Sequence, residues 1–422
     1  MDKQPISFEP PRGMRDFYPE DMAWRDRVFN AWRKATRISG FETYDACVVE
    51  SLELLQRKAG EEVSEQIYAF EDKSGRKLAL RAEMTPTLAR MIAARQGRLQ
   101  FPVKWSAIAQ CFRYERMTRG RKREHYQWNL DIIGEEGVQA EAEVLSTAAA
   151  ALAAMGLPAS AYRIHVNNRA LLGELLEKLG IAPEQHAAVF LALDKRGKIP
   201  DEEIAAILTE GGLAADAAAK VFDLLGVQTL DQAVELAGQD SPAIKRLRDL
   251  FAMAAEFGFA DRLMFDISVI RGLSYYTGIV FEAFDTERKF RAIFGGGRYD
   301  NLLTTIGGAP TPAVGLGFGD VVVAEVLKDF LGADAASERE GTFVGFMQEE
   351  QRTAAIRLAA KLRASGERAE LALTPLKPKQ FFSRAGAGTC AFAVFIGPDD
   401  VASGVARRKN LETRQEEQLA LG

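Results

Sequence analysis

Cysteine and histidine are scarce in this chain of 422 residues, which has three of each. The cysteines lie far apart, without a CxxC pair or a Cys/His spacing, which argues against a disulfide framework and a zinc site. The histidines are too few and too scattered for a metal cluster, and we expect the second and third to be structural. The six residues are Cys47, Cys111, Cys390, His125, His165 and His186.

Long hydrophobic runs are also lacking. No apolar run approaches the roughly 20 residues that span a bilayer, and the first residues contain no apolar core of a secretory signal. We therefore expect a cytoplasmic protein, in a reducing compartment, with no membrane partner. The formal net charge of −5 means that a polyanion must be met by local clusters of cations and not by the field of the whole chain.

Two common nucleotide-binding motifs are missing as well. The sequence has no GxxxxGK[ST], and the glycines at 315, 317 and 319 do not follow the GxGxxG spacing, so P-loop and Rossmann-type sites are disfavoured. Glycines are nevertheless frequent at 295–297 and 313–319, within segments that otherwise resemble strands. We expect these glycines to permit close approach of the backbone to a ligand.

The most informative stretch that is present runs from 111 to 134 and predicts a long antiparallel hairpin with a cationic tip. Side chains on a strand alternate between the two faces, so residues two apart share a face. One face of this hairpin is too polar for a core and suits a charged ligand. It carries Arg113 and Glu115 on the first strand and Gln127, Asn129 and Asp131 on the second, and the tip has cations at 116, 119, 121, 122 and 123.

Three further polar groups occur in strand-like segments of the same region. The alternation over 77–85 predicts that Arg81, Glu83 and Thr85 share one face. A turn at 271–278 contains Tyr275 and Tyr276, and the glycine triplet is followed by Arg298 and Asp300. Each group alone is more often a surface ion pair or a simple turn. Their occurrence together favours a functional site.

The order of the expected elements indicates a core at 1–330, a small polar linker at 331–341 and an α/β domain at 342–422. Within the core, 182–257 has a helical pattern with no strand signal, which indicates an inserted helical module. The other elements expected in the core are helices at 19–38, 52–58, 85–95, 141–155, 169–179 and 320–330 and strands at 44–50, 66–71, 77–83, 161–166, 263–270, 279–284 and 292–294. Those expected in the last domain are strands at 342–347, 369–373 and 390–396 and helices at 349–365 and 375–385.

These residues together resemble the histidyl-tRNA synthetases, which are class II aminoacyl-tRNA synthetases. The most specific stretches are FRYERMTRGRKREHYQ at 112–127 and RGLSYYTGIVFE at 271–282. The resemblance implies an α+β fold, in which an antiparallel class II sheet is flanked by helices and followed by an anticodon-binding domain. It also implies a homodimeric histidine–tRNA ligase that uses histidine, ATP, Mg²⁺ and tRNA(His).

The resemblance assigns roles to individual residues of this sequence. Arg113 is expected to contact the α-phosphate of ATP, Glu115 the adenine amino group and Arg121 the outer phosphates. Attack of a carboxylate on the α-phosphorus builds negative charge, so Arg113 and Arg271 are the expected catalytic cations. The histidine-binding set is Glu83, Thr85 and Gln127 for the α-ammonium group, Asp131 and Tyr276 for the imidazole, and Arg271 and Tyr275.

Four positions depart from the family pattern. Val322 stands where an arginine is expected, Cys47 replaces a proline, Asp131 is a shorter carboxylate than usual, and Ser274 stands where aspartate is common. A variant branch of synthetases explains these departures. The alternatives are a histidine-sensing subunit that resembles the synthetase-like partner of ATP phosphoribosyltransferase, and a module that binds tRNA without charging it.

Overall fold

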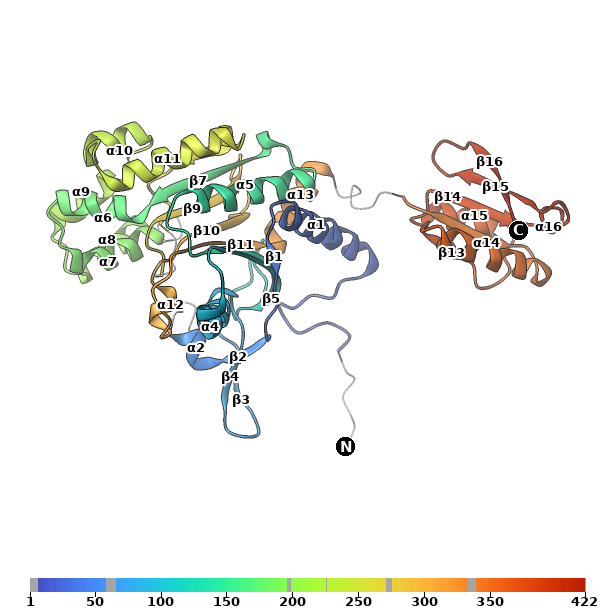
Figure 1. Ribbon diagram of the computed structural model, residues 1–422, viewed down its shortest axis with the longest axis horizontal. Helices are drawn as coiled ribbons and strands as arrows, with labels where there is room; N and C mark the ends of the chain where they lie inside the picture. The colour runs from blue at the N-terminus through green and yellow to red at the C-terminus, as the bar shows by residue number, and fades with distance from the viewer. Residues whose placement is uncertain are drawn as a thin grey trace. The chain divides into compact units, whose positions relative to one another are not determined.

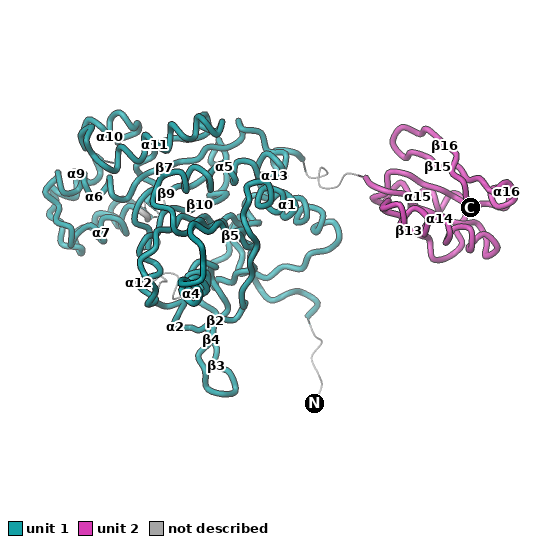
Figure 2. The backbone as a smooth tube through the Cα atoms, viewed as in Figure 1, with its two compact units in different colours: residues 1–333 teal, residues 334–422 magenta. Residues whose placement is uncertain are grey.

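The computed structural model describes residues 7–57, 66–195, 199–224, 226–270, 275–332 and 339–421. The chain divides into two compact units, Met1–Ala333 and Asp334–Gly422, shown in teal and magenta in Figure 2. The first unit contains an eight-stranded and a three-stranded sheet, the second contains a five-stranded sheet, and each unit has its own core. No helix among the described residues is both long and apolar enough to cross a membrane.

An eight-stranded sheet organises the first unit, in the order β1-β5-β6-β11-β10-β9-β7-β8. Only the pairs at its two edges, β1 with β5 and β7 with β8, are parallel. The predicted antiparallel sheet flanked by helices is therefore confirmed. The strands are β1 Glu42–Thr43, β5 Val103–Phe112, β6 Glu124–Ile133, β7 Tyr162–Asn168, β8 Leu263–Phe265, β9 Ile279–Asp285, β10 Phe294–Arg298 and β11 Ala313–Gly319.

The two faces of this sheet differ because the residues of β6 alternate between them. On one face Trp128 stacks on Trp32 of α1 (Pro19–Ile38) with 6.0 Å between ring centroids. On the other face Ile133 packs with Leu88 and Ile92 of α4 (Thr85–Arg95). In Figure 1, α5 (Gln139–Ala154) and α13 (Asp320–Leu331) lie with α1 on one side of the sheet, and α4 lies on the other.

Helices occupy the segment between β7 and β8. Asn168 caps the first of them, as predicted, by accepting a hydrogen bond from the N–H of Ala170 at 3.0 Å. The described part of 182–257 contains helices and no strand, as the pattern predicted, and the last helix packs on α5 and β7. These helices are α6 Arg169–Lys178, α7 Pro183–Asp194, α8 Asp201–Glu210, α9 Ala215–Leu224, α10 Leu230–Ala237 and α11 Pro242–Glu256.

A small three-stranded sheet corrects two predictions near the N-terminus. The strand expected at 44–50 does not form over that range, because β1 ends at Thr43 and pairs with β5, whereas β2 (Val49–Ser51) pairs with β4 (Lys77–Leu80) in the smaller sheet. Alternation alone cannot show that a chain passes from one sheet to another. The strand expected at 77–83 ends at Leu80, so Arg81, Glu83 and Thr85 do not share a strand face. The sheet is completed by β3 (Ala69–Glu71), and α2 (Leu52–Gln56) and α12 (Leu302–Thr305) are the other α-helices among the described residues of this unit.

The second unit has a five-stranded sheet in the order β13-β12-β14-β15-β16. Its first three strands are parallel and alternate with helices, as the sequence predicted. The antiparallel hairpin of β15 and β16 was missed, because its charged side chains give little strand signal. The elements are β12 Thr342–Phe346, α14 Arg352–Ala364, β13 Ala369–Leu371, α15 Pro378–Ala387, β14 Phe392–Ile396, α16 Pro398–Ser403, β15 Val405–Asn410 and β16 Glu416–Ala420.

Candidate active site

A cavity of about 770 Å³ lies in the first unit on the polar face of the large sheet. It brings together side chains from the loop after β4, from the β5–β6 connection, from β6 and from the turn before β9. Residues far apart in the sequence therefore share one wall, as the resemblance implied. The expected site residues on that wall are Glu83, Thr85, Arg113, Glu115, Arg121, Gln127, Tyr275 and Tyr276.

Arg113 and Glu115 lie just beyond the end of β5, in the connection to β6. The ladder ends at Phe112 opposite Glu124, so these two side chains do not alternate on a strand as predicted. Contacts fix them instead. The Nε of Arg113 donates to the carbonyl of Ala82 at 2.9 Å, and the carboxylate of Glu115 forms an ion pair with Arg121. The connection thus presents two guanidinium groups on either side of one buried carboxylate.

The polar face of β6 is formed as predicted, and the glycines of β11 make room for it. Gln127 donates to the side chain of Asn129 at 3.2 Å. A Cβ on Gly315 would meet the Asp131 carboxylate, and one on Gly317 would meet the Gln127 amide, both closer than the 3.0 Å that real Cβ atoms keep. These glycines therefore accommodate neighbouring side chains of the protein; they also line the cavity, and their expected role in the approach of a ligand stays a prediction.

Asp131 lies beneath the cavity wall and is 1% exposed. Its Oδ1 accepts a hydrogen bond from the hydroxyl of Tyr299 at 2.5 Å, and Tyr299 itself lines the cavity. Burial raises the pKa of Asp131 from 3.8 to about 7, although the hydrogen bond from Tyr299 acts in the opposite direction. Asp131 therefore reaches the cavity through Tyr299.

The raised pKa of Asp131 predicts a specific dependence of stability on pH. Because the folded protein holds this proton to a higher pH than the unfolded chain, Asp131 lowers stability progressively as pH rises from 3.8 to about 7. We expect Asp131→Asn, which cannot ionise, to lack this contribution. The melting temperature of the variant relative to the unsubstituted protein should then rise across this range and level off above it. A difference that stays constant with pH would contradict the raised pKa.

The turn before β9 joins the cavity through its tyrosines. The hydroxyl of Tyr275 donates to Glu83 at 3.3 Å, and the ring of Tyr275 meets that of Tyr299 edge to face. Arg271 and Ser274 lie outside the described residues, so the expected catalytic role of Arg271 stays a prediction. The nearby Arg81 has a structural role, because its guanidinium donates to the carbonyls of Gln110 and Ala46.

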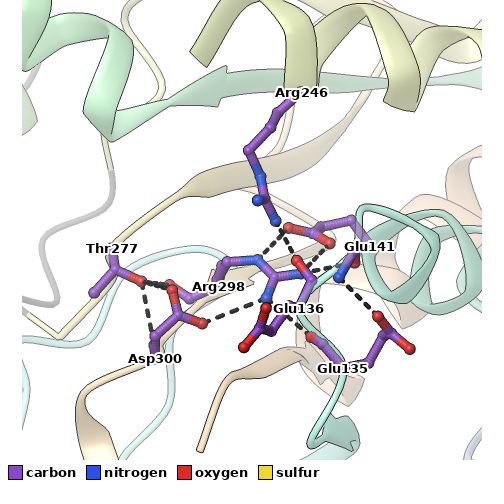
Figure 3. A network of polar contacts seen from close by, with 8 residues as sticks. Glu135, Glu136, Glu141, Arg246, Thr277, Arg298 and Asp300 are labelled. Carbon is purple, nitrogen blue, oxygen red and sulfur yellow. Dashed lines mark hydrogen bonds and ion pairs between the residues drawn. The ribbon is translucent and has the colours of Figure 1, made fainter. Parts of the chain in front are cut away.

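Arg298, which follows the glycine triplet, is bound in a buried network (Figure 3). Its guanidinium forms two hydrogen bonds with Glu141 of α5, at 2.8 and 2.7 Å, and both side chains are almost completely buried. It also donates to the carbonyls of Glu135 and Gly137. This corrects the grouping of Arg298 with the candidate ligand residues, since it joins β10 to the start of α5 instead.

Several cavity residues were not singled out from the sequence. His125 lies two residues before Gln127 on β6, so the same alternation could have identified it as a cavity residue. Burial and the charge of Arg113 lower the pKa of His125 to about 3, which keeps the imidazole neutral. Arg291 comes from the loop between β9 and β10, where no regular alternation of residues indicates which way a side chain points. In the part of the chain that the structure describes, no group of three His, Cys, Asp or Glu side chains could hold a metal ion.

Comparison with known proteins shows the family to which the chain belongs. Residues 13–319 match the family model described as histidyl-tRNA synthetase, and residues 335–422 match that of an anticodon binding domain. The chain is 42% identical to the chloroplastic/mitochondrial histidine–tRNA ligase of Arabidopsis thaliana over 99% of its own length and 86% of the relative. It is 37% identical to the histidine–tRNA ligase of Natronomonas pharaonis, with 97% and 95% of the two chains covered.

Solved structures show the same fold. A histidyl-tRNA synthetase from Nostoc sp. PCC 7120 superposes with a TM-score of 0.82 at 22% identity, covering 99% of this chain and 97% of the other. A Bacillus halodurans chain described as an ATP phosphoribosyltransferase regulatory subunit/histidyl-tRNA synthetase has a TM-score of 0.77 at 21% identity, with 94% and 100% covered. At these identities the likeness supports the fold alone.

Proposed function

The chain belongs to the histidyl-tRNA synthetase family, and from this premise we propose that it activates histidine with ATP and transfers the histidyl group to tRNA(His). The observation that carries the proposal is the shared cavity, which Arg113 and Arg121 line together with Glu83 and Gln127, two of the residues assigned to histidine. Formation of histidyl-adenylate needs ATP and histidine held side by side, and one cavity provides this.

The ATP half of the cavity would be formed by the β5–β6 connection. Arg113, fixed by the carbonyl of Ala82, is placed to stabilise charge on the α-phosphate during attack by the histidine carboxylate. Arg121 is assigned to the outer phosphates and Glu115 to the adenine amino group. Glu115 pairs with Arg121, and we infer that ATP separates the pair and replaces both partners.

The histidine half would be formed by the side chains on the other part of the wall. Glu83, Thr85 and Gln127 supply acceptors for the α-ammonium group. Tyr276 contacts the imidazole, and Asp131 acts on it through Tyr299. Arg271 is assigned to the reacting carboxylate and phosphate by the family resemblance, together with Tyr275 for histidine.

Magnesium fits this site as a companion of ATP. Mg²⁺ in such sites is typically held by one or two carboxylates together with substrate phosphates. The cavity wall offers single carboxylates such as Glu83, Glu115 and Glu282, and no dedicated cluster is found in the described residues. When bound, the ion would neutralise charge on the triphosphate.

The remaining assignments extend the family likeness to the whole chain. We propose that 1–330 is the catalytic core with a helical insertion at about 182–257, that 331–341 is a linker, and that 342–422 binds the anticodon of tRNA(His). A homodimer in the cytoplasm is the proposed working form.

One observation favours a second candidate function. Val322, at the start of α13, stands where the family pattern has an arginine, which is the kind of loss expected in a histidine-sensing paralogue. The anticodon-binding unit argues for the ligase. Charging of tRNA(His) with labelled histidine decides between them: histidyl-tRNA should accumulate with ATP and Mg²⁺, whereas binding of histidine without charging would support the sensor.

A further inference from the structure

We propose that Arg291, in the loop between β9 and β10, binds the outer phosphates of ATP and supplies the charge that Val322 lacks. This inference rests on the proposed activation of histidine with ATP. Arg291 and Val322 both line the cavity. Both also lie against the tip of the β5–β6 connection: a Cβ on Gly120 would be 3.4 Å from Val322 Cγ2 and 3.9 Å from Arg291 Cδ.

Gly120 directly precedes Arg121, the residue assigned to the outer phosphates. The Cδ of Arg291 and the side chain of Val322 therefore both lie close to the residue that directly precedes Arg121. Arg291 is exposed, and no ion pair or hydrogen bond of its side chain occurs within the described ranges. A cation without a carboxylate partner on a cavity wall is available to an anionic ligand.

The loop that carries Arg291 is fixed by hydrogen bonds. The buried carboxylate of Asp285 accepts from the N–H groups of Lys289 and Phe290, at 2.8 and 3.0 Å. The N–H of Ile293 donates to the carbonyl of Ala283 at 2.7 Å. The backbone on both sides of Arg291 is thus anchored. Since the side chain of Arg291 already lines the cavity, less conformational entropy of the loop is lost when it binds a ligand.

The tip of the connection is held against the same loop and against α13. The guanidinium of Arg119 lies 4.8 Å from the ring centroid of Phe290 and forms an ion pair with Glu325 at 3.1 Å. Glu325 also accepts from the N–H of Gly120 at 3.3 Å. These contacts bring the tip, the loop and the start of α13 to one place, so that Arg121 and Arg291 can act on the same phosphates.

Other cations near this wall are less suited to the role. Arg288 is engaged by Asp266 at 3.2 Å and by His165 at 3.0 Å. Arg119 is engaged by Glu325, as described above. Lys122 lines the cavity but belongs to the same connection as Arg121. Arg291 comes from a different element than Arg121 and, like Val322, lies against Gly120.

The test is the ATP dependence of histidine-driven pyrophosphate exchange in Arg291→Ala. Loss of a hydrogen bond to a charged group corresponds to roughly a 10- to 100-fold rise in KM for ATP. KM for histidine should change little, and Arg291→Lys should recover part of the loss. Affinity for a histidyl-sulfamoyl-adenosine analogue, which lacks the outer phosphates, should stay the same. Lys289→Ala is the matched control, because Lys289 belongs to the same loop but pairs with Glu287 and Asp329 outside the cavity.

The outcomes separate this inference from the proposed function. If the unsubstituted protein shows no exchange, the proposed activation of histidine fails, whatever Arg291 does. If it exchanges normally and Arg291→Ala keeps its KM for ATP, the assignment of Arg291 is overturned. The assignment is also overturned if Lys122→Ala raises KM for ATP in its place, or if Arg291→Ala slows only the transfer to tRNA.

Discussion

Replacing Arg113 by alanine is expected to lower the rate of histidyl-adenylate formation by about 10²–10³-fold, the usual effect of removing one preorganised donor from developing charge. Arg113 is partly buried, with 26% of its side chain exposed, and its Nε is held by the carbonyl of Ala82. This anchoring orients the guanidinium, of which one terminal nitrogen lies 3.9 Å from the Glu115 carboxylate, and so lowers the cost of presenting it to a ligand. The rate is measured by single-turnover formation of the adenylate with saturating ATP and histidine.

Arg116→Ala is the control for Arg113→Ala. Arg116 belongs to the same connection and is exposed, but it is not part of the cavity wall. Its removal changes the charge of the connection by the same amount and should leave the rate within about twofold, as expected for a screened surface charge. Equal losses in the two variants would show that Arg113 acts only through the general positive charge of the connection.

Arg298→Met is expected to destabilise the first unit by roughly 3–5 kcal/mol, because it leaves the carboxylate of Glu141 buried without its partner. The pair is bidentate and nearly inaccessible, with 4% of the Arg298 side chain and none of the Glu141 side chain exposed. Thermal unfolding of the full chain, followed at the transition of the first unit, measures the loss. Glu141→Leu combined with Arg298→Met should restore part of it, since no unpaired charge remains.

A matched exposed pair shows whether burial is the cause. Arg76 and Asp72 have the same nitrogen–oxygen distance of 2.7 Å, but 72% of the Arg76 side chain is exposed. Arg76→Met should therefore cost less than about 1 kcal/mol. If the two single substitutions destabilise the protein equally, the buried network does not hold α5 and β10 together as we describe.

The polar face of β6 shows how far alternation predicts a site. Trp128 points to the core while Gln127, Asn129 and Asp131 point to the other face, as a period of two requires. The same rule failed for Arg113 and Glu115, because the ladder ends one residue earlier and contacts with distant segments orient them. Local periodicity cannot show where a partner strand stops.

The glycine-rich strands show a second limit of predicting structure from sequence. In the sequence β10 and β11 are rich in glycine, and neither can be recognised as a strand over its full length, since glycine is depleted in strands. Their register explains the composition: Gly315 faces Asp131 across the ladder, and the missing Cβ gives the carboxylate room. Arg291 could not have been found in this way, because its place depends on a loop, a helix and the tip of a hairpin that meet only in the fold.

Histidine-dependent exchange of pyrophosphate into ATP is the most direct measurement of the proposed ligase activity. With Mg²⁺ present, the purified full chain should exchange pyrophosphate when histidine is added and should give only background without it. Such exchange would show that the cavity containing Arg113 and Arg121 forms the adenylate although Val322 replaces the usual arginine. Absence of exchange from folded protein that binds histidine would contradict the ligase and leave the histidine-sensing paralogue.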